Sequence, residues 1–340
     1  MQTSGIIAEH ERHTSRATIT ARSISVVVPV FNSELVLPEL VRRLYPVLVD
    51  HASAFELILV NDGSRDRSWD VICRLALEHD WVRGISLMRN YGQHNALLCG
   101  IRSAGNETII TMDDDLQHPP EEIPLLLPKL SEGFDVVYGT PQEEQHGFLR
   151  DFASLATKLV LQNSMGAEIA RKTTAFRAFR TRVRDAFVSY QSPFVSIDVL
   201  LTWGTTRFTT VPVRHHPRLV GASNYTVRKL VAHALNMMTG FSTLPLQFAS
   251  LIGFAFTLFG LGVFAYVVTR YLIQGGSVPG FSFLASAIAI FSGAQLLAIG
   301  IIGEYLGRMY QRTMNRPTYT VLDDTRLACR GMDLTRETNA

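Results

Sequence analysis

Three acidic residues and an amide stand together in the stretch TIITMDDDLQHPPEEI. Asp113 and Asp115 are separated by one residue, and Gln117 follows two positions later. In an extended backbone residues i and i+2 point to the same side, so these carboxylates would be aimed together while Asp114 points away. Carboxylate and amide oxygens suit Mg²⁺ or Mn²⁺, which usually keep positions open for substrate phosphates. The spacing therefore predicts a metal site of Asp113, Asp115 and Gln117.

The acidic stretch follows one of several apolar, β-branched segments that are typical of buried strands. Helical patterns near 34–50, 66–79 and 92–104 separate them, which indicates an α/β fold with a mainly parallel, Rossmann-like sheet. Ligands bind such sheets outside the carboxyl ends of the strands, where this chain gathers acids and amides that would repel without a cation. The predicted strands are 24–30, 56–60, 84–88, 108–112 and 135–139, with a further one in FTTVPV and a helix near 148–165.

The first strand is followed by PVFNSE, which has neither a GxGxxG fingerprint nor a P-loop. A metal held by aspartates can take the place of a glycine cradle for a diphosphate, and it makes the diphosphate a better leaving group. Asp62, at the end of the neighbouring strand, would be placed for ribose or base. The pattern predicts a nucleotide-sugar site.

Two apolar segments near the C-terminus, 244–269 and 281–303, exceed the roughly 20 residues that cross a bilayer. Before them, 226–243 has an apolar face typical of an interfacial amphipathic helix, with an ordinary surface helix as the alternative. Arginines before the first segment and after the second place both flanks in the cytoplasm and the 270–280 loop outside. We expect a multi-pass protein of the inner (plasma) membrane with a cytoplasmic catalytic domain.

The composition argues against several other classes of protein. Net charge is +2 with 18% charged residues, so there is no broad basic field and no nucleic-acid partner is expected. The three cysteines show no CxxC spacing, which argues against a disulfide framework and fits a reducing compartment. Residues 1–22 are polar, lack the apolar core of a signal peptide and are expected to be a disordered tail.

Four motifs in order, VVVPVFNSE, LVNDGSRD, RNYGQHNALLCGI and TMDDDLQHPPEEI, resemble GT-A glycosyltransferases of family 2. The paired apolar segments, LLAIGIIGEYLGRMYQ and RPTYTV narrow the likeness to polyprenyl-phosphate glycosyltransferases, which include bactoprenol glucosyltransferases, undecaprenyl-phosphate formamido-arabinose transferases and dolichol-phosphate mannose synthases. The resemblance covers roughly 23–322. It implies a GT-A domain over 23–225, followed by the 226–243 helix, membrane helices over 244–269 and 281–303, and a cytoplasmic segment over 304–340. Residues after Tyr319 are expected to be peripheral.

The resemblance also implies roles for individual residues. The nucleotide-sugar positions are Pro29, Phe31, Asn32, Glu34, Asp62, Asp113 and Arg177. The metal positions are Asp113, Asp115 and Gln117, with Mg²⁺ or Mn²⁺ as cofactor. The acceptor-phosphate positions are Arg150, Arg218, Ser223 and Tyr225, and the catalytic set is Asp115, Arg177 and Arg218. The implied partners are a nucleotide sugar, a polyprenyl phosphate, the bilayer and further copies of the chain, as a homotetramer.

Three positions depart from the family pattern. Ser33 replaces an acid in the first motif, and Pro141 stands where many relatives have arginine. Ala175 replaces an acid sometimes proposed as a base. A base is not required, because a phosphate acceptor is already anionic at neutral pH and no proton need be removed before attack. The expected reaction is an inverting, metal-dependent transfer of one sugar, preferably from a UDP-sugar, to undecaprenyl phosphate.

Other interpretations of the same residues stay open. The aspartates could cap the helix that follows, Asp62 could organise the DGS turn, and Arg218 and Arg228 could face lipid headgroups. His118 could join the metal site, whereas the adjacent side chains of His215 and His216 diverge on a strand.

Three rival functions stay open: a GDP-mannose-using synthase of the dolichol type, a processive polysaccharide synthase, and a membrane-tethered scaffold. A processive synthase would need more membrane spans and a QxxRW signature.

Overall fold

The computed structural model describes residues 23–141, 165, 169–170, 172–192, 194–216, 241, 243–274 and 280–326. Its N-terminal part alternates strands and helices: β1 (Ile24–Val30), α1 (Leu37–His51), β2 (Phe55–Asn61), α2 (Ser68–Glu78), β3 (Val82–Leu87), α3 (Gln93–Ser103) and β4 (Thr108–Thr111). The described part continues with η1 (Pro120–Glu122), α4 (Ile123–Ser131), β5 (Val136–Pro141), β6 (Arg177–Arg180), η2 (Thr181–Ala186), α7 (Ile197–Gly204), β7 (Phe208–Val213), α9 (Leu244–Gln274), α10 (Phe281–Thr313) and β8 (Val321–Asp324).

Within these residues the strands form one eight-stranded sheet in the order β7-β5-β6-β4-β1-β2-β3-β8. β1 pairs in parallel with both β2 and β4, and β2 pairs in parallel with β3. The carboxyl ends of β1 to β4 therefore lie at one edge of the sheet, as the sequence predicts. The mainly parallel α/β fold is confirmed, whereas the antiparallel β6, inserted between β4 and β5, has no counterpart among the predicted strands.

Helices cover both faces of the sheet. All seven residues of β1 are buried, and they alternate between two cores. Val26, Val28 and Val30 pack with α1, α2 and α4, whereas Val27 packs with α3, η2 and α7. A strand buried on both faces needs apolar residues at every position, which is why its run is continuous.

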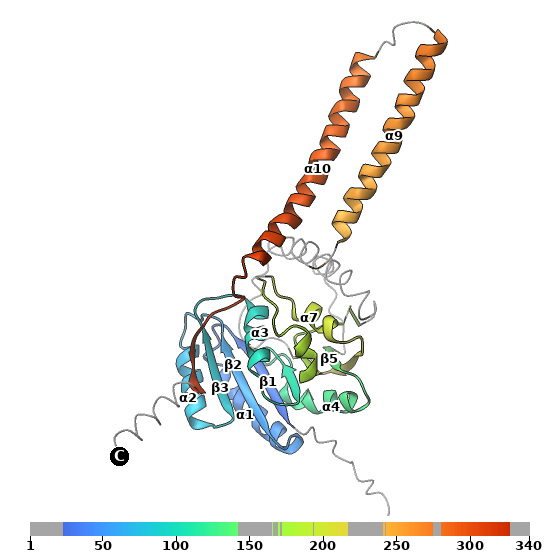
Figure 1. The fold of residues 1–340 in the computed structure, drawn as a ribbon. Helices are drawn as coiled ribbons and strands as arrows, with labels where there is room; N and C mark the ends of the chain where they lie inside the picture. The colour runs from blue at the N-terminus through green and yellow to red at the C-terminus, as the bar shows by residue number, and fades with distance from the viewer. Residues whose placement is uncertain are drawn as a thin grey trace, which may run out of the picture.

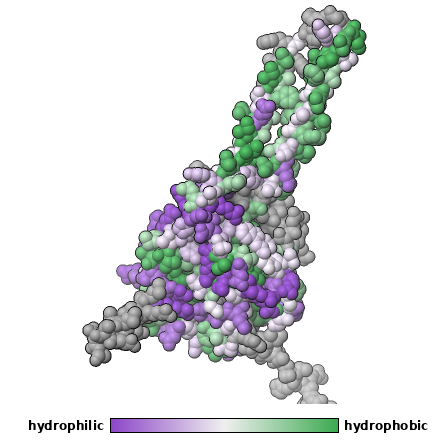
Figure 2. Space-filling view, in the orientation of Figure 1, coloured by the Kyte–Doolittle hydropathy of each residue, from purple (hydrophilic) through white to green (hydrophobic). Residues whose placement is uncertain are grey.

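The two longest helices, α9 and α10, stand side by side away from the sheet (Figure 1). Each contains a stretch that is apolar and long enough to cross a membrane, Leu244–Ile273 in α9 and Ile290–Thr313 in α10. In both helices, no residue of the most apolar part is buried. Figure 2 shows hydrophobic surface along both helices. The core helix of a soluble protein would be mostly buried, so α9 and α10 are not such core helices. The second stretch ends later than the predicted residue 303.

The chain returns from α10 to the sheet. β8 pairs antiparallel with β3 at the sheet edge, with Val321 opposite Leu87 and Asp324 opposite Ile85. The expectation that the residues after Tyr319 are peripheral is wrong for Val321–Asp324, because they are an edge strand of the α/β domain. Residues 1–22, 148–164, most of the 226–243 helix, 275–279 of the predicted 270–280 loop and 327–340 lie outside the described residues, whereas 270–274 are the last residues of α9.

Candidate functional site

A cavity of about 280 Å³ opens at the carboxyl edge of the sheet. We call it the acidic pocket, because three of its lining residues, Asp62, Asp113 and Asp114, are aspartates. Among the predicted nucleotide-sugar residues, Pro29, Phe31, Asp62 and Asp113 line it. The full lining is Pro29, Val30, Phe31, Asp62, Asn90, Gly92, Gln93, Asp113 and Asp114.

The acidic stretch is a turn rather than an extended segment. β4 ends at Thr111, and the backbone turns at Asp114 and Asp115. Leu116 then adopts a left-handed conformation at φ 58°, with its side chain buried. The alternation from which the metal geometry was predicted does not hold, because it requires extended backbone. Asp115 does not line the pocket, and its Oδ1 accepts a 3.1 Å hydrogen bond from the Gln117 backbone N–H.

Asp114 faces the pocket instead of pointing away. Its Oδ2 accepts hydrogen bonds from the Ser33 hydroxyl and, at 3.3 Å, from the Phe31 backbone N–H. Burial raises the pKa of the Asp114 carboxyl, although these two donors act in the opposite direction. Asp114 thus joins the turn after β4 to the turn after β1. Ser33, one of the three residues that depart from the family pattern, is one half of this link.

Asp62 fixes the loop after β3. Its Oδ1 accepts from the Tyr91 N–H at 2.7 Å and its Oδ2 from the Gly92 N–H at 2.8 Å. Burial raises the pKa of Asp62 despite both donors. The next residue, Gly63, has φ 65°, and a Cβ there would lie 2.5 Å from the Asn90 backbone N. Asp62 therefore shapes the wall of the pocket, and its carboxylate oxygens already accept from backbone amides.

Two residues that were predicted to bind the nucleotide sugar instead form hydrogen bonds with a neighbouring turn. Asn32, at φ 57°, accepts through Oδ1 a 2.8 Å hydrogen bond from the Arg65 N–H. Glu34 accepts through Oε2 a 2.8 Å hydrogen bond from the Arg67 N–H. Neither residue lines the acidic pocket, and both tie the turn after β1 to the turn after β2.

Gln93 was not among the predicted site residues, yet its Nε2 donates a 2.6 Å hydrogen bond to Asp113 Oδ1 across the pocket. It is the first residue of α3, and Asn90 and Gly92 line the pocket just before it. The available signal was their place after the third predicted strand, because the parallel strands end at the same edge.

Arg177 lies behind the acidic turn. The residue is 1% exposed, and its guanidinium forms an ion pair with Asp198 and donates a 3.0 Å hydrogen bond to Thr111 Oγ1. Tyr138, whose ring lies 5.8 Å from the guanidinium carbon, donates through its hydroxyl to Asp198 at 3.0 Å. Arg177 does not line the acidic pocket, so its predicted contact with phosphates stays a prediction.

The residues that follow β7 contact the acidic stretch. The Arg214 side chain donates to Glu122 at 2.6 Å, and the His216 N–H donates to the Gln117 carbonyl at 2.8 Å. The rings of His215 and His118 lie 4.9 Å apart. Burial, with the nearby His215, lowers the pKa of His118 to about 4. The predicted acceptor residues Arg150, Arg218, Ser223 and Tyr225 lie outside the described residues.

The oxygen donors of the acidic turn are of the kind that a hard divalent cation prefers. Asp113, Asp115 and Gln117 supply two carboxylates and an amide within five residues of one turn. No cluster of three or more His, Cys, Asp or Glu side chains converges as a metal site in the described ranges. Mg²⁺ is commonly held by one or two carboxylates plus substrate phosphates, so such a site would be completed by its ligand.

The sequence matches the profile described as "Glycosyl transferase family 2" over residues 25–189. It is 36% identical over 303 residues to the undecaprenyl-phosphate 4-deoxy-4-formamido-L-arabinose transferase of Shewanella sediminis (strain HAW-EB3), covering 88% of this chain and 92% of that protein. The protein of the same name from Salmonella choleraesuis (strain SC-B67) is 35% identical, covering 88% and 93%.

Among solved structures, the fold is similar to that of glucosyl-3-phosphoglycerate synthase from Mycobacterium tuberculosis, in a complex with Mn²⁺, UDP and glucosyl-3-phosphoglycerate. The identity is 19% and the TM-score 0.48, over 64% of this chain and 78% of that one.

Proposed function

Because the chain belongs to glycosyltransferase family 2, we propose that it transfers a single sugar from a nucleotide sugar to a polyprenyl phosphate at the cytoplasmic face of a membrane. The proposed donor is a UDP-sugar and the proposed acceptor undecaprenyl phosphate, with inversion at the anomeric carbon. The names of relatives that match 88% of the chain support this acceptor.

One observation carries the proposal on the structural side. A pocket with three carboxylates opens at the same edge of the sheet to which the chain returns from α10. Thr320 lies seven residues after the end of α10, and its carbonyl accepts a 3.0 Å hydrogen bond from Met88, just past the end of β3. A donor in the acidic pocket would therefore lie on the side of the domain that faces the membrane helices (Figure 1).

Different residues of the pocket and the acidic turn are proposed to bind different parts of the donor. Pro29 and Phe31 form the pocket wall against which the nucleoside would lie. Asp113, Asp115 and Gln117 would hold Mg²⁺ or Mn²⁺. Such an ion neutralises charge that develops on the departing diphosphate. The loop amides fixed by Asp62 keep the pocket in shape before the donor binds.

The acceptor side needs no catalytic base. A phosphate monoester has its second pKa near 6 and is anionic at neutral pH, so its oxygen can attack the anomeric carbon directly. The task of the protein is to hold two anionic substrates in line. Arg218, Arg150, Ser223 and Tyr225 are proposed to meet the acceptor phosphate, and Arg218 also belongs to the proposed catalytic set.

The test uses the full chain in lipid nanodiscs with a short polyprenyl phosphate and UDP-, GDP- and dTDP-sugars in turn. We expect release of nucleoside diphosphate only with Mg²⁺ or Mn²⁺ and only with the lipid phosphate present. Mass spectrometry identifies the glycosylated lipid, and NMR of the product gives the anomeric configuration. Full turnover with a chelator would overturn metal dependence, and a silent panel of donors would overturn the proposed function.

A further inference from the structure

The segment that follows the second long helix is bound along the edge of the catalytic domain. We call residues 318–326 the C-terminal strap. It begins five residues after α10 ends and includes β8, which pairs antiparallel with β3. Since β3 is parallel to β2, the strap starts near the carboxyl ends of the strands, beside the acidic pocket, and finishes near their amino ends.

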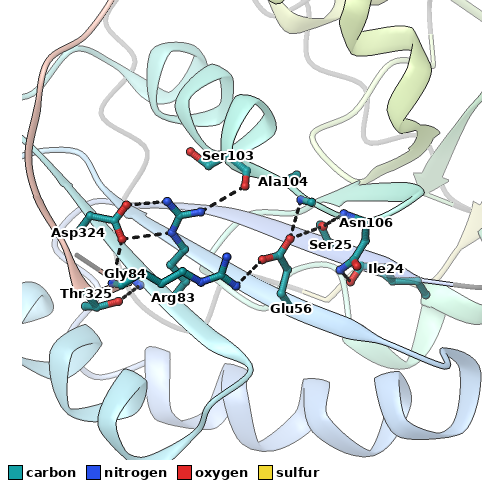
Figure 3. A network of polar contacts seen from close by, with 12 residues as sticks. Ile24, Ser25, Glu56, Arg83, Gly84, Ser103, Ala104, Asn106, Asp324 and Thr325 are labelled. Carbon is teal, nitrogen blue, oxygen red and sulfur yellow. Dashed lines mark hydrogen bonds and ion pairs between the residues drawn. The ribbon is translucent and has the colours of Figure 1, made fainter. Parts of the chain in front are cut away.

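Ion pairs and hydrogen bonds hold the C-terminal end of the strap, its far end from α10, against the sheet (Figure 3). Asp324 forms a two-pronged ion pair with Arg83, at 2.6 Å for the shorter contact, and the two side chains are 8% and 16% exposed. Thr325 Oγ1 accepts a 3.0 Å hydrogen bond from the Gly84 N–H. Glu56, which also accepts from Ser25 and the Gly105 N–H, holds Arg326 at 2.8 Å. The strap is therefore tied to β1, β2 and β3 through side chains that face away from the pocket.

The near end of the strap reaches the loop that forms the pocket. Met88 donates its N–H to the Thr320 carbonyl at 3.0 Å. Hydrogen bonding with the side chain and the backbone of Thr320 lowers the pKa of the Tyr91 phenol. Arg89 lies 4.7 Å above the same ring. Tyr91 is also the residue whose backbone N–H donates to Asp62 at 2.7 Å.

These contacts form a continuous path from the membrane helix to the donor pocket. The Thr320 carbonyl accepts from the Met88 amide, the Tyr91 amide of the loop that follows donates to Asp62, and Asn90 and Gly92 of the same loop line the pocket. We propose that the strap is a positioning element of the donor site, in which Thr320 and Tyr91 hold the 88–92 loop in the shape that binds the nucleotide. This inference rests on the proposed function.

The arrangement has a thermodynamic consequence. If attachment of the strap raises affinity for the nucleotide, then nucleotide binding strengthens attachment of the strap by the same factor. Since the strap continues from α10, the donor site and the membrane anchor are coupled through Thr320. The coupling needs no movement of the sheet, because it acts on a loop held by a few hydrogen bonds.

The experiment measures nucleotide binding rather than sugar transfer, in the full chain in nanodiscs. UDP, GDP and dTDP with Mn²⁺ are titrated by calorimetry into the wild type, and the tightest binder is used for the variants. Thr320→Val removes the hydroxyl at constant shape, Thr320→Ser keeps it, and Tyr91→Phe removes the phenol. We expect the first and third to weaken binding about fivefold each, the usual size for one hydrogen bond.

The serine variant is expected to bind the nucleotide like the wild type. The double variant Thr320→Val, Tyr91→Phe is expected to lose no more affinity than either single variant, because both substitutions remove the same contact. In turnover assays donor KM should rise while acceptor KM stays constant. Equal binding by Thr320→Val and wild type, or additive losses in the double variant, would overturn the inference while leaving the transferase intact. A wild type that binds no nucleotide would overturn the proposed function together with it.

A matched pair separates positioning from stability. Asp324→Asn loosens the far end of the strap, and Asp135→Asn removes an equally buried carboxylate that accepts from Arg182 and Arg207 away from the strap. Both variants should melt at lower temperature than the wild type. Only Asp324→Asn should weaken nucleotide binding, and a similar weakening in Asp135→Asn would contradict the proposed role.

Discussion

The side-chain amide of Gln93 donates a 2.6 Å hydrogen bond to Oδ1 of Asp113, joining the first turn of α3 to the acid that follows β4. An amide and a carboxylate from two different strand ends thus meet across the acidic pocket. Both residues line the acidic pocket, where we propose that a diphosphate and its cation bind. It gives the acidic turn a defined orientation against α3.

Replacing Asp113 or Asp115 should strongly lower turnover without unfolding the protein. We expect Asp113→Asn and Asp115→Asn to lower kcat/KM by about a hundredfold or more, since groups that stabilise developing charge contribute at this level. Stabilisation by nucleoside diphosphate with Mn²⁺ in thermal shift should be lost in both. Glu121→Gln, an exposed partner of Arg43 in the same stretch, is the control and should retain both properties. Wild-type rates in Asp115→Asn would exclude that residue from the metal site.

Gly63 should be needed for the shape of the donor pocket. Gly63→Ala would strain a residue at φ 65° and push a Cβ to 2.5 Å from the Asn90 backbone, which cannot yield as a side chain would. Strain of this kind costs about 1–3 kcal/mol. Gly133→Ala is the matched control, because Gly133 has φ 105° but nothing within 4 Å of its added Cβ. Chemical denaturation should show both variants destabilised, while calorimetry should show weaker nucleotide binding in Gly63→Ala alone.

The buried pair of Arg177 and Asp198 allows the predicted role of Arg177 to be tested. Arg177→Met leaves Asp198 in a largely buried site without its cation, which typically costs about 3–5 kcal/mol. Arg177→Met with Asp198→Leu removes both charges and should recover much of that stability. We expect activity to return with stability, because Arg177 is 1% exposed and does not line the pocket. A stable but inactive double variant would instead support direct contact between Arg177 and the donor phosphates.

Low pH should lower the free energy of unfolding of the domain through protonation of Asp135. Burial alone would raise the pKa of this carboxyl, but hydrogen bonds from Arg182, Thr205 and Arg207 lower it to about 2, against 3.8 for an ordinary aspartate. The unfolded chain therefore binds more protons between these two values, so the stabilisation is present above about pH 4 and is lost as pH falls toward 2. Urea midpoints measured from about pH 5 down to 3 should fall more steeply in wild type than in Asp135→Asn. The exposed Asp80→Asn should follow the wild type.

The sequence alone determined the parts of this protein that depend on local patterns. Continuous apolar runs such as Ile24–Val30 predict strands buried on both faces, and their alternation with helices implies a parallel sheet with the motifs at one edge. The two apolar helices follow from length and composition. These features could be predicted because each depends on residues adjacent along the chain.

Only the tertiary structure decided which side chains face the pocket and what holds the edge of the sheet. The turn at Asp114 and Asp115 depends on contacts with Phe31 and Ser33, 83 and 81 residues away from Asp114 in the chain. Arg83 and Asp324, 241 residues apart, meet only because the chain returns from α10 to β3. Such contacts leave no periodic pattern in the sequence, since the free energy that selects them comes from burial and pairing of groups brought together by the whole fold.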